Sequence, residues 1–180
     1  MARPSELAQH VAFLRAINVG GRNVTMAELR QRFTEMGFTD VESLIASGNI
    51  VFRTDAATPP PALEERIQTA LAGALGYDVA TFIRAPADLA AIADSAFAGE
   101  TGSHQVGLLK AVPVVEAVAA TLALQTDGDA IVIVGREIHW LRRDPAASQL
   151  VNGRFERALG GQATFRSVST LRRIAAKCSL

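Results

Sequence analysis

Short apolar runs alternate with apolar positions at helical spacing, and their order predicts strands and helices in turn. His10–Ile17 is an apolar, β-prone run that ends in a loop rich in Gly and Asn. A helix is predicted from Thr25, because Thr25 and Glu28 form a capping box ahead of apolar residues at helical spacing. Gly37 suits the C-terminal end of that helix. These signals predict a strand followed by a capped helix.

The next segments complete a β-α-β-β-α-β order. The predicted elements are strands Val41–Ala46 and Asn49–Arg53 around a Ser47-Gly48 turn, a helix Leu63–Leu75 and a strand Asp78–Arg84. A short helix, Pro86–Ser95, follows.

The same order then repeats. The predicted elements are strand Gln105–Val112, helix Pro113–Leu122, strands Ala130–Val134 and Glu137–Leu141, helix Ala147–Leu159, strand Ala163–Arg166 and helix Val168–Ala176. We therefore expect an α+β fold of two tandem ferredoxin-like βαββαβ modules with antiparallel sheets, related by internal duplication. Residues 1–85 form the first module, 86–104 a helical linker and 105–180 the second module with a C-terminal helix.

This topology brings distant loops to one edge of the first sheet. The first two strands of a split β-α-β unit run parallel, with a right-handed crossover between them. The loop after the first strand, Asn18–Asn23, and the hairpin Ser47–Asn49 should therefore lie at the same end. Val112-Pro113 and Gly135-Arg136 occupy the equivalent edge of the second module.

The chemistry of this edge favours an anionic ligand, a phosphate or a carboxylate. Gly20-Gly21 allows close approach of backbone N–H groups, and the helix that begins at Thr25 presents a positive dipole end. The alternative is that the glycines only permit a tight turn and the asparagines only bond the loop backbone. Neither a Walker loop nor a Rossmann glycine spacing is present. The candidate ligand-binding residues are Arg15, Asn18, Gly20, Gly21, Arg22, Asn23, Ser47, Gly48, Asn49, Arg166 and Thr170.

Charge is balanced overall but uneven along the chain, which leaves a second reading open. Residues 54–135 carry three basic and ten acidic groups, and residues 136–180 carry nine and three. Either the basic end packs near the acidic middle, or it forms a nucleic-acid-binding surface. The aromatic fraction of 6% argues against the second option, because base stacking needs aromatic side chains. The basic candidates are Arg136, Arg142, Arg143, Arg154, Arg157, Arg166, Arg172 and Arg173.

Composition also restricts the compartment. No apolar run approaches the roughly 18 residues that a membrane span needs, and the N-terminus lacks an apolar signal stretch. The lone cysteine, Cys178, cannot form an internal disulfide, which fits a reducing compartment. We therefore expect a cytoplasmic protein that does not act on membranes.

No catalytic set emerges from the spacing of reactive residues. His10, His104 and His139 lie far apart in sequence, without metal-ligand spacing, so neither a metal nor a cofactor is expected. Glu64-Glu65 is expected to face solvent on its helix. An enzyme that uses an edge arginine to stabilise an oxyanion remains an alternative, without an identifiable base or nucleophile. A protein-interaction module that pairs through a sheet edge is a third alternative, and the oligomeric state stays open.

Two motifs resemble a bacterial domain-of-unknown-function family, DUF1697. They are Leu14–Asn23 with Met26–Leu29 after it, and Ile45–Phe52. The resemblance spans nearly the whole chain and implies paired α+β modules, but no established activity. The chain departs from the family pattern at Ala16, where Gly is usual, at Arg22, where Lys is usual, and at Ser167-Val168, where Asn-Trp is usual, whereas Arg166 and Thr170 match.

Overall fold

The computed structural model describes residues 6–18, 20–21, 23–45 and 48–178. The chain divides into two compact units, Met1–Pro86 and Ala87–Leu180, so that the boundary falls at the start of a helix, α3 (Pro86–Asp94). Each unit is described by itself below.

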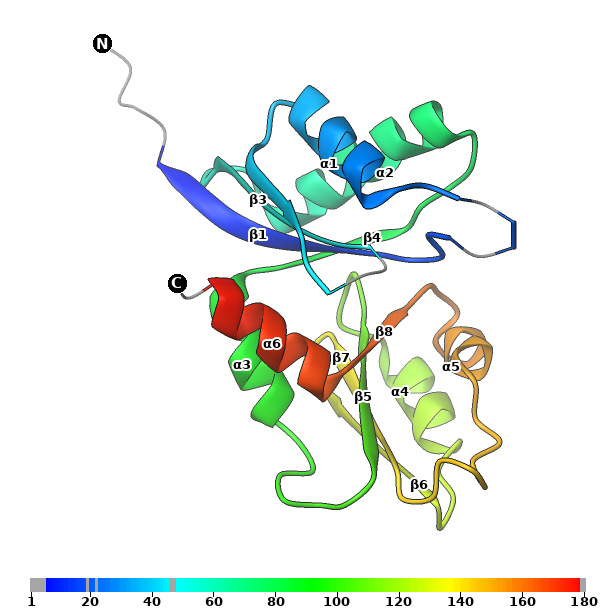
Figure 1. Ribbon diagram of the computed structural model, residues 1–180. Helices are drawn as coiled ribbons and strands as arrows, with labels where there is room; N and C mark the ends of the chain where they lie inside the picture. The colour runs from blue at the N-terminus through cyan, green and yellow to red at the C-terminus, as the bar shows by residue number, and fades with distance from the viewer. Residues whose placement is uncertain (1–5, 19, 22, 46–47, 179–180) are drawn as a thin grey trace. The chain divides into compact units, whose positions relative to one another are not determined.

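The first unit is a four-stranded antiparallel sheet with two helices on one face (Figure 1). Its strands follow the order β2-β3-β1-β4, as in a ferredoxin-like module. The elements are β1 (Leu7–Leu14), α1 (Met26–Glu35), β2 (Thr39–Ser43), β3 (Asn49–Asp55), α2 (Pro60–Leu75) and β4 (Thr81–Arg84).

The core of the first unit follows from the two periodicities in the sequence. Alternate strand residues such as Leu14 and Phe52 belong to the same buried cluster as Leu29 and Phe33 of α1 and Ile67 of α2. Removing each of these large side chains from water contributes about 1.5–3 kcal/mol. Burial of the apolar face of each helix therefore fixes α1 and α2 on the sheet.

The second unit repeats this strand order as β6-β7-β5-β8, again fully antiparallel. Its elements are α3, β5 (Ser103–Leu108), α4 (Val115–Leu122), β6 (Asp129–Val134), β7 (Glu137–Arg142), α5 (Asn152–Leu159), β8 (Thr164–Ser167) and α6 (Val168–Cys178). The shared topology confirms the expected α+β fold of two modules. Internal duplication stays a prediction, because shared topology does not establish common descent.

Helices cover both faces of the second sheet (Figure 1). Trp140 of β7 packs against Phe155 of α5, with ring centroids 5.1 Å apart. Its neighbour His139 points to the opposite face, where its ring bonds Ser95, the residue after α3. Alternation along β7 thus separates an apolar layer under α4 and α5 from a layer with polar groups under α3 and α6.

Several element boundaries differ from the sequence expectation, and two of them have an identifiable local reason. β1 ends at Leu14 rather than Ile17, because Ala16 and Asn18 have φ values of +57° and +60°, which a strand cannot accommodate. The helix expected from Ala147 begins at Asn152, because Asp144 closes a separate turn in which its carboxylate accepts from the N–H of Ala146 at 3.0 Å.

Candidate functional site

The structure places the end of β1, where the loop after it begins, beside the loop between β2 and β3. The backbone N–H of Leu14 donates to the carbonyl of Gly48 at 2.7 Å. A Cβ added at Gly48 would lie 3.1 Å from the Cβ of Leu14, so glycine allows this close approach. We call the described residues of these two loops, Arg15–Asn18, Gly20-Gly21, Asn23 and Gly48-Asn49, the rim.

Left-handed backbone is concentrated in the rim. Ala16, Asn18, Gly20 and Gly21 have φ values of +57°, +60°, +63° and +81°. For Ala16 this conformation costs about 1–2 kcal/mol. Gly20 and Gly21 are exposed, and a Cβ added at either would have no atom within 4 Å. Among the described residues, the rim therefore offers exposed backbone at Gly20-Gly21.

The rim asparagines bond the backbone of their own loops. The Asn18 side chain accepts from the N–H of Val24 at 2.6 Å and donates to the carbonyl of Val24 at 2.9 Å. The Asn49 amide donates to the carbonyls of Leu44 and Ile45 at 3.1 and 3.3 Å. These contacts hold both loops in shape, so the two amides act as positioning groups in the rim.

The start of α1 already carries a negative charge. The Thr25 hydroxyl accepts from the N–H of Glu28 at 3.1 Å, and the Glu28 carboxylate accepts from the N–H of Thr25 at 2.8 Å. This backbone hydrogen bond is the main reason that the pKa of Glu28 lies below its usual value. The predicted capping box is present, and it places a carboxylate where an anion was expected to meet the helix dipole.

The remaining predicted residues divide between the rim, the undescribed positions and the second unit. Arg15 is half-buried, its backbone N–H donates to the carbonyl of Ala80 at 2.9 Å, and Asn23 is exposed. Arg22 and Ser47 lie outside the described residues. Arg166 and Thr170 belong to the second unit.

Arg166 and Thr170 have partners within their own unit. The Arg166 guanidinium donates to the Thr164 hydroxyl and to the carbonyl of Phe165, both at 2.9 Å. Burial lowers the pKa of Arg166 to about 10. The Thr170 hydroxyl lies 2.9 Å from the Ser167 hydroxyl. The suggested contribution of both residues to an anion site stays a prediction.

One sequence interpretation is wrong. Glu64 does not face solvent beside Glu65, because Glu64 is only 3% exposed and its carboxylate accepts from the backbone N–H of Ile83 at 2.8 Å. Glu65 is exposed, as expected. Burial of a glutamate on this face of α2 is tolerated because a backbone N–H of β4 donates a hydrogen bond to its carboxylate.

Sequence spacing also missed a histidine pair. The structure places His104 Nε2 3.1 Å from His139 Nδ1, although 35 positions separate the two residues. In the register of β5 and β7, Val106 lies opposite His139 and His104 opposite Leu141. Both histidines therefore lie on one face of neighbouring strands. Pairing the two predicted strands in register could have found this contact.

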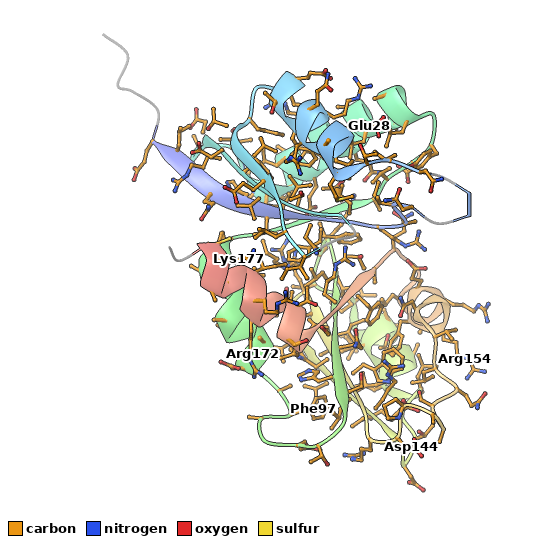
Figure 2. The ribbon with its side chains drawn as sticks, viewed as in Figure 1. Glu28, Phe97, Asp144, Arg154, Arg172 and Lys177 are labelled. Atoms are coloured by element: carbon orange, nitrogen blue, oxygen red, sulfur yellow. The ribbon has the colours of Figure 1, made fainter. Side chains whose placement is uncertain are left out.

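The basic residues of the C-terminal third do not all lie on one side of the second sheet. Figure 2 shows Arg154 on α5 and Arg172 on α6, on opposite sides of the second sheet. Arg143 pairs with Glu100 at 3.4 Å, and Arg172 pairs with Asp94 at 2.6 Å. The basic residues are thus divided between two faces of the sheet, and nucleic-acid binding stays a prediction.

Two further classes of site are not found in the described part of the chain. Across residues 6–18, 20–21, 23–45 and 48–178, no group of three or more His, Cys, Asp or Glu side chains is placed to hold a metal ion. Over the same residues, none of the helices combines the length and apolar content needed to cross a bilayer.

Comparison with known proteins supports the fold and identifies the family. The family described as "Protein of unknown function (DUF1697)" matches residues 7–139. The chain is also similar to the solved structure of the conserved bacterial protein SP0830 from Streptococcus pneumoniae. The TM-score is 0.73 at 22% identity, over 95% of this chain and 98% of that chain, and at this identity the likeness shows the fold alone. Among curated proteins, none matches the chain. Because the family match covers well over half of its length, the chain belongs to the DUF1697 family.

Proposed function

We propose that the protein binds a small anionic molecule, a phosphate or a carboxylate, at the rim of its first unit. The observation that carries this proposal is the 2.7 Å backbone bond between Leu14 and Gly48, which holds the end of β1, where the first glycine-containing loop begins, beside the second. The left-handed conformation of Ala16 is costly, and costs of this kind concentrate at functional sites.

The ligand contacts are the exposed backbone of Gly20-Gly21 and the side chains of Arg15 and Asn23. Successive backbone N–H groups in a turn can face one concave region, which favours an anion. The Glu28 carboxylate stands at the N-terminus of α1, so the anion is placed against the loop rather than against the helix end. Asn18 and Asn49 preorganise the loops and lower the entropy cost of binding.

Amide NMR titration at constant ionic strength tests the proposal. We expect inorganic phosphate, acetate and a nucleoside monophosphate to shift the amide signals of Gly20, Gly21 and Gly48 with saturation. The variant Arg15→Gln should weaken binding about 10-fold, since a charge-assisted hydrogen bond contributes roughly 1.5–3 kcal/mol. Arg53→Gln is the matched control, because Arg53 lies further along β3 and pairs with Asp40 at 3.3 Å.

Two results would contradict the proposal. One is the absence of saturable shifts at the rim with all three anions. The other is equal weakening by the Arg15 and Arg53 variants, because a general charge effect would then account for the binding.

Nucleic-acid binding stays as an alternative prediction, which the same protein can test. Contacts with phosphate groups give a steep loss of affinity with salt. Retention on RNA or DNA at low salt that falls steeply as salt rises would favour this alternative over the rim proposal.

Pairing of two chains through a sheet edge is the other alternative prediction. It would appear in light scattering as a particle size that rises with protein concentration.

A further inference from the structure

A chain of three side chains crosses the polar layer of the second unit. The Ser95 hydroxyl lies 2.9 Å from His139 Nε2, and His139 Nδ1 lies 3.1 Å from His104 Nε2. His139 is fully buried, whereas His104 is only half-buried. The chain thus runs from the end of α3, along one face of the sheet, to a ring at the edge of a cavity.

The bonding pattern determines which ring nitrogens carry hydrogen. The Ser95 hydroxyl donates its only hydrogen to the carbonyl of Ile92 at 2.9 Å, so it accepts from His139 Nε2–H. Burial, with a smaller effect of His104, lowers the pKa of His139 to about 4, so at neutral pH its Nδ1 is an acceptor. His104 must then donate through Nε2–H, which leaves a lone pair on His104 Nδ1.

This lone pair is accessible. No described residue forms a hydrogen bond with His104 Nδ1, and this nitrogen is not fully buried. Solvent or a ligand can therefore reach it. Burial lowers the pKa of His104, Arg172 lowers it further and Glu100 partly opposes this. His104 therefore presents a neutral acceptor of fixed tautomer.

The ring of His104 lines a polar cavity of about 330 Å³ within the second unit. The α3–β5 loop, the start of β5 and the β8–α6 junction form its walls. Its lining includes Phe97, Glu100, Ser167, Ser169 and Arg172. Figure 2 shows Arg172 on α6 and Phe97 in the loop after α3, both on the face of the sheet that α3 and α6 cover. The volume lies within the range of small-molecule sites, roughly 300–1,000 Å³.

Arg172 supplies a positive charge that a ligand can share. Its Nε and one terminal nitrogen donate to Asp94 Oδ1 at 3.2 and 2.6 Å. Both side chains of this ion pair are more than half exposed, at 56% and 63%, so the pair itself contributes little. The cavity carboxylate, Glu100, lies 3.4 Å from Arg143, which offsets its charge. Cation and acceptor thus line one space.

We propose that this cavity binds a small hydroxylated organic anion, a sugar phosphate or a hydroxy acid, whose acidic group pairs with Arg172 and whose hydroxyl donates to His104 Nδ1. His139 is a positioning residue, because it fixes the tautomer and orientation of His104 without reaching the ligand. This site is separate from the rim and does not depend on the function proposed for it.

The first test is binding of three hydroxylated anions, glucose 6-phosphate, glycerol 3-phosphate and citrate, at constant ionic strength. Inorganic phosphate tests the contribution of charge alone, and glucose tests the contribution of hydroxyl groups alone. Histidine ring NMR should show His104 as the Nε2–H tautomer and a saturable shift of its Nδ1 signal with at least one hydroxylated anion. We expect phosphate to bind at least 10-fold more weakly and glucose to give no shift.

Variants identify the contacts. Arg172→Gln should weaken binding about 10-fold or more, and Arg172→Lys should restore part of the affinity. Arg154→Gln, which removes an exposed cation of the same unit from the opposite helical layer, should leave the affinity unchanged. His139→Gln should change the His104 tautomer ratio and reduce affinity while the Arg172 signals still respond to phosphate.

Three binding results and one spectroscopic result would overturn the proposal. The binding results are no binding by any of the three hydroxylated anions, equal binding of inorganic phosphate and glucose 6-phosphate, and equal losses from the Arg172 and Arg154 variants. A wild-type spectrum with His104 as the Nδ1–H tautomer would also overturn it, because the ring would then offer a donor to the ligand.

Discussion

The carboxylate of Glu64 on α2 accepts a hydrogen bond from the backbone N–H of Ile83 on β4 at 2.8 Å. β4 is an edge strand, and its register with β1 leaves this N–H on the open side of the sheet. Unpaired donors along a strand edge invite pairing with another chain. The buried glutamate thus satisfies one edge donor and blocks strand addition at that point.

Removing this acceptor should destabilise the protein. Glu64→Leu leaves the Ile83 N–H buried without a partner, and we expect a loss of about 1–3 kcal/mol in the free energy of unfolding. Glu64→Gln, which keeps an acceptor oxygen, should cost less. Urea unfolding followed by far-UV circular dichroism measures both. Glu65→Leu is the exposed control and should stay within about 0.5 kcal/mol; equal effects at the two positions would contradict the assignment.

His10 should be replaceable with a gain in stability. Both of its ring nitrogens are buried without a hydrogen-bond partner among the described residues, and its ring lies 5.7 Å from that of Phe52. A neutral imidazole always carries one N–H, so an unpaired donor is buried here at a cost. His10→Phe should raise the free energy of unfolding by about 1 kcal/mol. His10→Gln keeps polar atoms in place and should give no gain; a gain from both variants would show that polarity is not the cause.

The left-handed backbone at Ala16 predicts a second stabilising change. Ala16→Gly relieves the steric cost of a φ of +57° and should add about 0.5–1 kcal/mol, after the entropy lost by glycine on folding. The same replacement in the middle of a helix, Ala70→Gly in α2, should cost about 1 kcal/mol. Thermal unfolding of the two variants should therefore shift in opposite directions. Shifts in the same direction would mean that Ala16 is not strained.

A buried carboxylate organises the apolar layer of the second unit. Asp129 accepts hydrogen bonds from Trp140 Nε1 at 2.8 Å, from the Ser148 hydroxyl at 2.6 Å and from the Thr126 hydroxyl at 3.1 Å. Burial alone would raise the pKa of Asp129, but these hydrogen bonds and the charge of Arg142 outweigh it and lower the pKa. The carboxylate is therefore ionised and fully bonded at neutral pH.

Asp129→Asn should destabilise the second unit by about 1–3 kcal/mol. The reason is that an amide has only one acceptor oxygen, and its NH₂ group cannot accept from the donors that now bond the carboxylate. Trp140 is the only tryptophan of the chain, so its fluorescence reports unfolding of this unit specifically. The exposed neighbour Asp127→Asn is the control and should leave the urea midpoint of Trp140 emission nearly unchanged. A midpoint in Asp129→Asn that equals the wild-type value would contradict the network.

The sequence predicted element order better than it predicted local contacts. Capping at Thr25 and the paired hairpins are local signals, so the two βαββαβ modules could be identified before any coordinates. The end of β1 and the start of α5 were not predicted correctly. Left-handed residues interrupt the strand and an Asp turn delays the helix, although the residue composition does not change at those points. The edge that joins the two loops followed from topology, and Leu14 and Gly48 meet there.

The chemistry within the units could not be predicted in the same way. The contact between His104 and His139 depends on strand register, and the burial of Glu64 depends on which face of α2 meets β4. Neither property is encoded in a short motif. The roles of Asn18 and Asn49 are an intermediate case, because loop asparagines commonly bond backbone, but their partners are known only from the fold.

The last prediction concerns pH. Burial lowers the pKa of His139 to about 4, whereas an unfolded histidine titrates near 6.5. Between these pH values the histidine of the unfolded chain binds a proton and His139 in the folded chain does not. The contribution of His139 to the free energy of unfolding is therefore fully present above about pH 6.5 and is lost as the pH falls toward 4. His104 adds to the lowering of this pKa, and the pKa of His104 is itself lowered by Arg172 and raised by Glu100.

In urea unfolding followed by Trp140 fluorescence, we expect His139 to lower the free energy of unfolding by on the order of 2–3 kcal/mol between pH 6.5 and pH 4. In His139→Gln the loss over this range should be smaller by that amount, while the decline below pH 4 from carboxylate protonation remains. Ring NMR of the folded wild type should place the His139 midpoint near pH 4. A midpoint close to 6.5, or identical pH slopes in the two proteins, would mean that the imidazole is charged within the fold, and the assigned donor pattern from His104 through His139 to Ser95 would not hold.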